Sequence, residues 1–173
     1  QSLVHPGQYA LIAAVMSTAA APPQLAEQIA ELLLSGGTLG SIYDYTEQDY
    51  EVLYALGHSL YAQGRYADAA KAFGFLVMHN HLEKRYVGAF ASSLQMAKRY
   101  EQAVQYYTLA SAMDMSDPAP TFHTAECLIA LNRLDDAREA LGFVVAQSSD
   151  AARQPLRERA QALLALLERQ TAH

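Results

Sequence analysis

Three alanines recur along the chain at intervals of 34 residues, and this spacing constrains the fold more than any other feature of the sequence. Two further sets of residues, both upstream of the alanines, keep the same interval. Since each interval contains two amphipathic stretches separated by a turn, the spacing predicts a tandem array of similar helix pairs. The periodic sets are Ala69, Ala103 and Ala137; Leu60, Leu94 and Leu128; and Arg65, Arg99 and Arg133.

A period of 34 residues with small residues at fixed points is the signature of the tetratricopeptide repeat, a unit of two helices called A and B. The sequence therefore predicts an all-α fold with three tandem repeats over residues 46–149, N-terminal helices before them and a C-terminal capping helix over residues 150–173. Such helix pairs stack to bury their apolar faces, and the A helices then line a concave groove.

The start and end signals within each repeat place the individual helices. Thr46, followed three residues later by Asp49, indicates a helix N-cap with an acidic first turn. Gly64 is expected to close the first A–B turn. The predicted A helices span Thr46–Gln63, Glu83–Ala97 and Pro118–Leu131, the B helices span Tyr66–Asn80, Tyr100–Asp114 and Leu134–Gln147, and the cap spans Asp150–Gln170.

The chain before the repeats is expected to have two parts. We interpret residues 1–21 as an N-terminal extension, of which the part before Met16 is either added by cloning or upstream readthrough; the alternative is an ordinary amphipathic first helix. Pro22 and Pro23 break any continuing helix. Residues 22–45 are predicted to form a helical region with an apolar face.

Composition excludes several classes of function. The 173 residues carry a net charge of −6, which argues against a nucleic-acid ligand because such proteins need a basic face. No apolar run reaches the roughly 18 residues of a membrane span. The apolar stretch of residues 9–21 lacks a basic leading segment, so we read it as non-targeting. The single Cys127 cannot form an internal disulfide and suits a reducing compartment.

Two clusters of reactive side chains contain residue types found in catalytic or metal sites. His79 and His81 are two residues apart, a spacing that does not place both rings on one helical face. His123, Glu126 and Cys127 could lie together on one helix, yet the repeat places Cys127 among core positions, where a thiol is inert. The sequence therefore predicts no enzyme, no metal site and no cofactor.

The repeat register predicts which side chains face the groove. Positions 2, 5, 9 and 12 of each repeat, counted from Tyr50, Lys84 and Pro118, should line it and form a mixed aromatic and polar channel. Such a channel suits an extended peptide, since aromatic walls take apolar side chains and polar groups pair with the backbone; the alternative is that some of the tyrosines are ordinary core or rim. The predicted residues are Glu51, Tyr54, His58, Tyr61, Arg85, Gly88, Ser92, Gln95, Ala119, Phe122, Glu126 and Ile129.

Several segments add a resemblance that the spacing cannot supply. The chain resembles the class II chaperones of bacterial type III secretion systems from about Leu25 to its C-terminal helix. Two departures are Lys98 and Asn132, which stand where many relatives have glycine. The segments that carry the resemblance are Gly36-Gly37-Thr38-Leu39, Leu53-Tyr54-Ala55-Leu56, Tyr61-Ala62-Gln63-Gly64-Arg65-Tyr66, Met113-Asp114-Met115, Asp117-Pro118, Phe122-His123 and Ala125-Glu126-Cys127-Leu128.

The resemblance implies a cytoplasmic bacterial chaperone without enzymatic activity. Its clients would be the hydrophobic translocator proteins that form the pore in the host membrane, held as an extended segment in the concave groove. By motif, the resemblance adds Tyr86 and His123 to the client-binding set and repeats Tyr54, Tyr61 and Phe122. It implies no binding to nucleic acid or to a membrane.

The resemblance also implies a homodimer formed through the helices before the first repeat. An alternative function is a general protein-interaction scaffold or a co-regulator of secretion gene expression that joins a transcription regulator. The residues expected at the dimer interface are Leu25, Ile29, Leu32, Leu33, Leu39 and Ile42.

Overall fold

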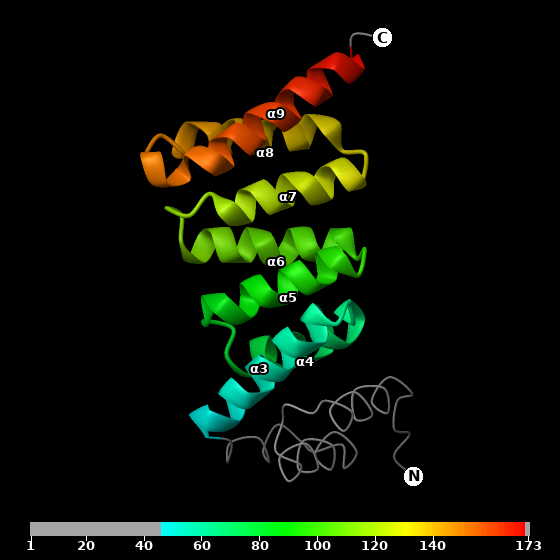
Figure 1. Cartoon of the computed structure of the whole chain (residues 1–173), viewed down its shortest axis with the longest axis vertical. Helices are drawn as coiled ribbons and strands as arrows, with labels where there is room; N and C mark the ends of the chain where they lie inside the picture. Colours follow the sequence, from blue (N-terminus) through cyan, green and yellow to red (C-terminus); the bar gives the residue numbers. More distant parts are fainter. Residues whose placement is uncertain (1–45, 172–173) are drawn as a thin grey trace. The chain divides into compact units, whose positions relative to one another are not determined.

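A computed structural model describes residues 46–171, which form α-helices and one short 3-10 helix but no strand, and this confirms the predicted all-α fold. Contacts divide the chain into two units, residues 1–81 and 82–173. The first unit contains α3 (Glu47–Ala62) and α4 (Tyr66–His79) (Figure 1). The second contains α5 (Lys84–Met96), α6 (Tyr100–Met113), α7 (Ala119–Ala130), α8 (Leu134–Gln147), η2 (Ala151–Arg153) and α9 (Gln154–Thr171).

The helix termini follow local sequence signals closely. At the start of α3, the Thr46 hydroxyl accepts a hydrogen bond from the backbone N–H of Asp49 at 3.3 Å, and the Asp49 carboxylate accepts one from the Thr46 N–H at 2.8 Å. This reciprocal pair is a capping box, which satisfies two N–H groups that the helix itself cannot bond. The other predicted A and B helices begin and end within about two residues of the observed bounds, and α8 has the predicted bounds. In the predicted cap, the short η2 comes first and α9 begins at Gln154.

Each A helix ends in the same left-handed turn. Gly64, Lys98 and Asn132 have φ angles of 74°, 61° and 59°. In each turn, the following arginine donates its backbone N–H to the carbonyl of a leucine five residues earlier, at 2.8–2.9 Å. These are Schellman turns, which satisfy the last carbonyls of the helix and reverse the chain. The 34-residue period therefore sets the chain reversals as well as the helices.

Small residues bring the helices of each pair close together. The three periodic alanines at positions 69, 103 and 137 are all fully buried. In the first pair, Gly57 of α3 faces Phe73 of α4 so closely that a Cβ at position 57 would lie 2.5 Å from Cε1 of the Phe73 ring. The corresponding pairs in the later repeats are Ala91 with Tyr107 and Ala125 with Leu141, so each repeat sets a small residue of the A helix against a large one of the B helix.

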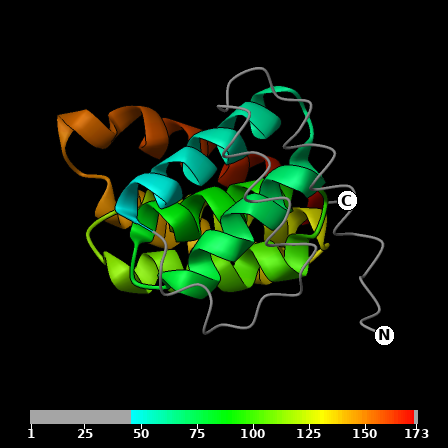
Figure 2. The same ribbon diagram turned by 90° about the horizontal axis from the view of Figure 1, so that it is seen from below.

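In the second unit, helices pack in chain order (Figure 1, Figure 2). α5 packs against α6, α6 against α7, α7 against α8, and α8 against α9. The predicted cap is found as η2 and α9. A continuous core joins its Ala160 and Leu167 to Phe122, Leu141 and Val144. Within residues 46–171, no helix is long and apolar enough to cross a membrane.

The expected dimer interface and the expected N-terminal parts, 1–21 and 22–45, lie outside the described residues. Those boundaries and the six dimerisation residues Leu25, Ile29, Leu32, Leu33, Leu39 and Ile42 therefore stay predictions.

Lys98 is strained in its left-handed turn, and this gives a stability prediction. A residue with a side chain loses about 1–2 kcal/mol of stability in the left-handed region, and glycine avoids this cost. Part of the stability gained is offset because glycine has greater freedom in the unfolded chain. We expect Lys98→Gly to stabilise the fold by about 0.5–1 kcal/mol in urea unfolding. Asn132→Gly should stabilise the fold by a smaller amount, because asparagine tolerates the left-handed region better than lysine does. Lys98→Ala is the control, and an equal gain there would show that φ is not the cause.

The Gly57–Phe73 contact gives a second prediction. Gly57→Ala should destabilise the chain by about 1–3 kcal/mol, because the new methyl group overlaps a ring that is itself 1% exposed. Phe73→Leu in the same chain copies the Ala125–Leu141 pair and should recover part of that loss. The measurement is a double-mutant cycle in urea. Gly142→Ala is the matched control, since its Cβ would meet nothing within 4 Å; simple additivity at positions 57 and 73 contradicts the prediction.

Candidate functional site

The predicted groove residues of the first unit form an aromatic surface on α3. Tyr54 and His58, one turn apart, meet edge to face with ring centroids 4.5 Å apart, and their rings also lie 5.7 Å and 5.1 Å from that of Phe73. Two turns along, Tyr61 packs edge to face against Tyr66 at 5.1 Å. Phe73 is fully buried beneath Tyr54 and His58, so the core supports these two rings and they present a preformed surface.

None of the four α3 residues expected in the groove is buried. Glu51, Tyr54 and Tyr61 are half-buried and His58 is exposed, whereas the opposite side of the helix carries the buried residues. The α3 surface is therefore accessible on the side that the repeat register predicts. Contact with a client stays a proposal.

The groove residues that the repeat register predicts on α5 are exposed or half-buried and carry no aromatic ring. Arg85 is exposed, and its guanidinium lies 5.2 Å from the centroid of the Tyr86 ring and 3.4 Å from the Glu83 carboxylate. Gly88, Ser92 and Gln95 are half-buried. Among these three positions, only Gln95 has a long side chain, which reaches towards α6 and α7.

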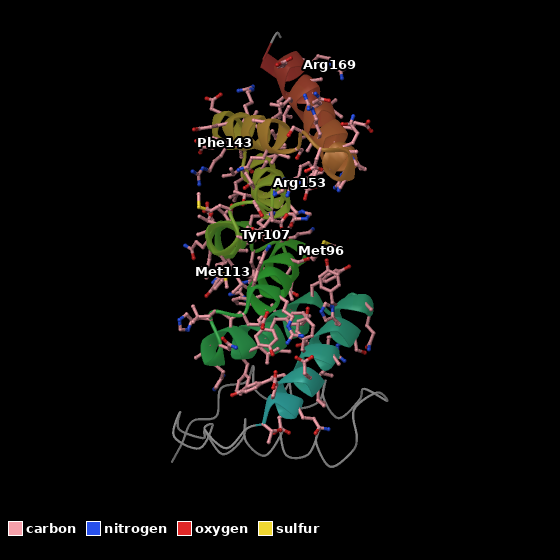
Figure 3. All side chains as sticks on the ribbon, turned by 90° about the vertical axis from the view of Figure 1, so that its left-hand side faces the viewer. Met96, Tyr107, Met113, Phe143, Arg153 and Arg169 are labelled. Atoms are coloured by element: carbon pink, nitrogen blue, oxygen red, sulfur yellow. The ribbon has the colours of Figure 1, made fainter. Side chains whose placement is uncertain are left out.

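Gln95 belongs to a hydrogen-bond network that joins three helices. Its side-chain carbonyl accepts from the hydroxyl of Tyr107 at 2.8 Å, and its amide donates to Glu126 Oε2 at 3.1 Å. Nδ1 of His123 lies 2.8 Å from the same carboxylate oxygen, and the His123 ring stacks on that of Tyr107 with centroids 5.3 Å apart. Figure 3 labels Tyr107 among the side chains of this unit. The network fixes the orientation of the Glu126 carboxylate.

The C-terminal helix contributes Arg159 to the same region. Its Nη2 lies 3.5 Å from Glu126 Oε1, and its Cζ lies 4.5 Å from the centroid of the Phe122 ring. The Arg159 side chain is 59% exposed, whereas that of Glu126 is 29% exposed. The guanidinium thus lies between a carboxylate and an aromatic face.

Two residues expected to bind the client directly are core residues instead. Phe122 is 1% exposed and Tyr86 is 4% exposed, which corrects the prediction that their side chains line the groove. For Phe122 the reason is tertiary: its ring joins the core shared by α7, α8 and α9, and Arg159 covers it. Ile129 and Ala119 are half-buried, and Ile129 packs against the same core.

The electrostatics keep Glu126 ionised. Partial burial raises its pKa, but the hydrogen bonds from His123 and Gln95 and the nearby charges of His123 and Arg159 outweigh that effect and lower the pKa below its usual value. A half-buried carboxylate of this kind needs donors on both oxygens. Oε2 has two close donors, whereas the only donor that the described part of the chain offers Oε1 is Arg159.

The catalytic interpretation of Cys127 has little chemical basis. The side chain is buried, and burial, with a contribution from the Glu126 charge, raises the pKa of the thiol to about 12. His123 is bonded to Glu126 and not to the sulfur. Within the described ranges, no three histidine, cysteine or acidic side chains gather as a metal site. His79 bonds to the Phe75 carbonyl at 2.7 Å and stacks on the Phe75 ring.

A lysine aligns the two A helices of the second unit. Nζ of Lys84, at the start of α5, lies 2.9 Å from a carboxylate oxygen of each of Asp114 and Asp117, in the loop before α7. Asp117 also accepts the N–H of Ala119 at 3.0 Å, and Asp114 accepts from Ser116. The two aspartates therefore cap the loop, while Lys84 joins the first turns of α5 and α7.

Sequence reasoning missed three contributors to this region. Tyr107 and Lys84 lie 12 and 30 residues from their first partners, and Arg159 lies 33 residues from Glu126. For Tyr107, a signal existed: it replaces Phe73 and Leu141 at a buried repeat position, and a buried hydroxyl requires a partner. Arg159 gave no such signal, since it lies outside the repeat register.

The comparisons with known proteins agree with this architecture. Two family models, both described as tetratricopeptide repeat, match residues 94–167 and 50–78. Low calcium response locus protein H of Yersinia pestis is 29% identical over 136 residues, which cover 79% of this chain and 80% of that protein.

Two solved chaperones are more informative because their partners are present. PcrH, a Pseudomonas aeruginosa protein, in complex with the chaperone-binding region of PopD is 34% identical, covering 74% of this chain and 97% of that chain, with a TM-score of 0.69. The chain belongs to the tetratricopeptide-repeat translocator chaperones of type III secretion. The Yersinia enterocolitica member SycD, solved with a peptide of the translocator YopD, is 26% identical, covering 74% of this chain and 98% of that chain, with a TM-score of 0.68.

The family match includes A-helix surfaces of this translocator chaperone. The family models match the helices that carry the aromatic surface of α3 and the network of Gln95, Tyr107, His123 and Glu126. The geometry thus provides two preformed surfaces, one aromatic and one charged, each within its own unit.

The ion pairs of Lys84 with Asp114 and Asp117 make the folding stability of this chaperone depend on pH in the acid range. The Ser116 hydroxyl and then Lys84 lower the pKa of Asp114 to about 2, and for Asp117 the bonds to Lys84 and Ala119 lower the pKa despite its partial burial. Carboxylates with lowered pKa stabilise the fold above their unfolded pKa, near 4, and this contribution is lost as the pH falls towards 2. Lys84→Met should therefore lower the urea midpoint at pH 7 and make its further fall between pH 4 and 2 shallower.

Lys98→Ala serves as the control for the Lys84 variant, because it removes the same charge from a turn. Its pH profile should run parallel to that of the wild type. A Lys84→Met profile that also runs parallel contradicts the role assigned to the bridge.

Proposed function

We propose that this chain is a chaperone that binds and stabilises the hydrophobic translocator proteins of a type III secretion system before their export. The observation that carries this proposal is the likeness to PcrH and SycD, relatives solved with segments of translocators bound. It acts by mass action, since covering apolar client segments lowers the population of unbound, aggregation-prone client. It works in the bacterial cytoplasm, before export.

The client is held as an extended segment along the A helices. On α3, the rings of Tyr54, His58 and Tyr61 offer walls for apolar side chains. Phe73 supports Tyr54 and His58, and Tyr66 packs against Tyr61. On α5 and α7, Gln95 and Glu126 offer polar groups to the client. Phe122 and Tyr86 are both buried, and they shape this surface from the core side.

The chaperone acts without catalysis. A thiol with its pKa raised to about 12 is not a nucleophile near neutral pH, so Cys127 is a core residue. The histidine beside it serves the Glu126 network. Holding a client by a preformed surface needs no reacting group and no cofactor.

Co-purification tests the function directly. The full chain, tagged at its C-terminus, is expressed in its native host and isolated under mild conditions. A translocator with hydrophobic segments should co-purify, and its soluble yield on co-expression should rise. Isolation of only unrelated proteins, with no gain in translocator solubility, contradicts the proposal.

The α3 surface gives a prediction at the residue level. Tyr54→Ala combined with Tyr61→Ala should weaken translocator binding at least about tenfold, because removal of aromatic anchors at an interface typically costs more than 1–2 kcal/mol. Binding is measured by titration of the co-purified translocator. Thermal unfolding is recorded in parallel because Tyr54 also packs on Phe73. Tyr100→Ala on the B helix α6 is the control, and unchanged binding by the folded double variant refutes the groove assignment.

A further inference from the structure

Arg159 occupies a position that has the chemistry of an arginine-binding subsite. Its guanidinium has an aromatic face on one side, with Cζ 4.5 Å from the Phe122 ring centroid, and a carboxylate on another, with Nη2 3.5 Å from Glu126 Oε1. A planar, delocalised cation is recognised by this combination of ring and carboxylate. The chain fills the subsite with a side chain of its own.

The carboxylate is oriented without help from Arg159. Glu126 Oε2 lies 2.8 Å from His123 Nδ1 and accepts from Gln95 Nε2 at 3.1 Å, and Gln95 is in turn held by Tyr107 at 2.8 Å. Oε1 has Arg159 as its only donor in the described part of the chain. Departure of Arg159 therefore leaves a prepared acceptor that still needs a cation or a hydrogen-bond donor.

The present occupant is weakly held. The Arg159 side chain is 59% exposed, and 3.5 Å is at the outer limit of a hydrogen-bond distance. Because the Arg159 side chain is mostly exposed, its ion pair with Glu126 contributes little to stability. A second guanidinium can compete with Arg159 for the ring and the carboxylate, because little free energy is lost when the side chain turns into solvent.

We propose that Phe122 and Glu126 form a specificity subsite for an arginine side chain of the client segment, which replaces Arg159 when the client binds. The identity of the occupant rests on the proposed chaperone function, because Gln95 and Glu126 lie at A-helix positions along which the client is held. Lysine fits less well, since its compact ammonium cannot stack on the ring and reach Oε1 with a planar fork. Arg159 thus competes with the client side chain, and a guanidinium is the side-chain group that can replace it at both the ring and Oε1.

Two tripeptides test the subsite in the full chain without a client. One is N-acetyl-Leu-Arg-Leu-amide, and the other replaces arginine by citrulline, which has nearly the same shape without the charge. Each is titrated into the isotopically labelled protein, and the side-chain amide of Gln95 and the backbone amide of Glu126 report occupancy by their NMR shifts. The wild type, Arg159→Ala, Glu126→Gln and Arg169→Ala are compared.

Arg159→Ala should bind the arginine peptide about three- to tenfold more tightly than the wild type, because the competing side chain is gone. Glu126→Gln should lose this binding, and citrulline should bind weakly to every variant. Arg169→Ala is the matched control for charge: it removes an arginine near the end of the same helix, labelled in Figure 3, and should match the wild type.

Three outcomes overturn the proposal: Arg159→Ala binding no more tightly than Arg169→Ala, equal binding of citrulline and arginine, or shifts that spare Gln95 and Glu126. The citrulline comparison needs no change at Glu126, so it decides the question even if Glu126→Gln fails to fold. Failure of a translocator to co-purify contradicts the chaperone function and leaves the tripeptide result standing. Loss of tripeptide binding alone removes the subsite and leaves the chaperone function intact.

Discussion

Chain reversal at a left-handed residue is the constraint on which the rest of this structure depends. Each A helix is followed two residues later by Gly64, Lys98 or Asn132, and the same pair of backbone hydrogen bonds closes every turn. Because the turn fixes where the B helix starts, it also fixes which small residue faces which large one across the pair. A shift of one residue at a turn would rotate the facing side chains by about 100° and bring bulky groups into contact.

The close helix contacts explain why the functional surfaces can be rigid. On α3, Tyr54 and His58 rest on a ring that Gly57 allows to approach closely. On α7, a buried Phe122 and a bonded carboxylate form a floor and an edge. In both cases side chains are ordered before a client arrives, so less conformational entropy is lost on binding.

Most of the fold could be predicted from sequence because its determinants are local. The helix ends depend on nearby residues such as Thr46 and Asp49, and the repeat interval carries the pairing of small and large side chains. Lys98 and Asn132 share the left-handed φ of Gly64, which occupies the same place in the first repeat. The site was predicted less well. The burial of Phe122 depends on α9, a helix outside the register, and no local pattern reports which residue a distant arginine will cover.

The burial of Cys127 has a practical consequence for this chaperone. Its thiolate is almost absent near neutral pH, and maleimide and iodoacetamide reagents react with thiolates. A cysteine introduced at an exposed position can therefore be labelled with a fluorophore or spin label while the natural one stays unmodified. Site-specific spectroscopy is thus practicable on a chain that keeps Cys127 in its core.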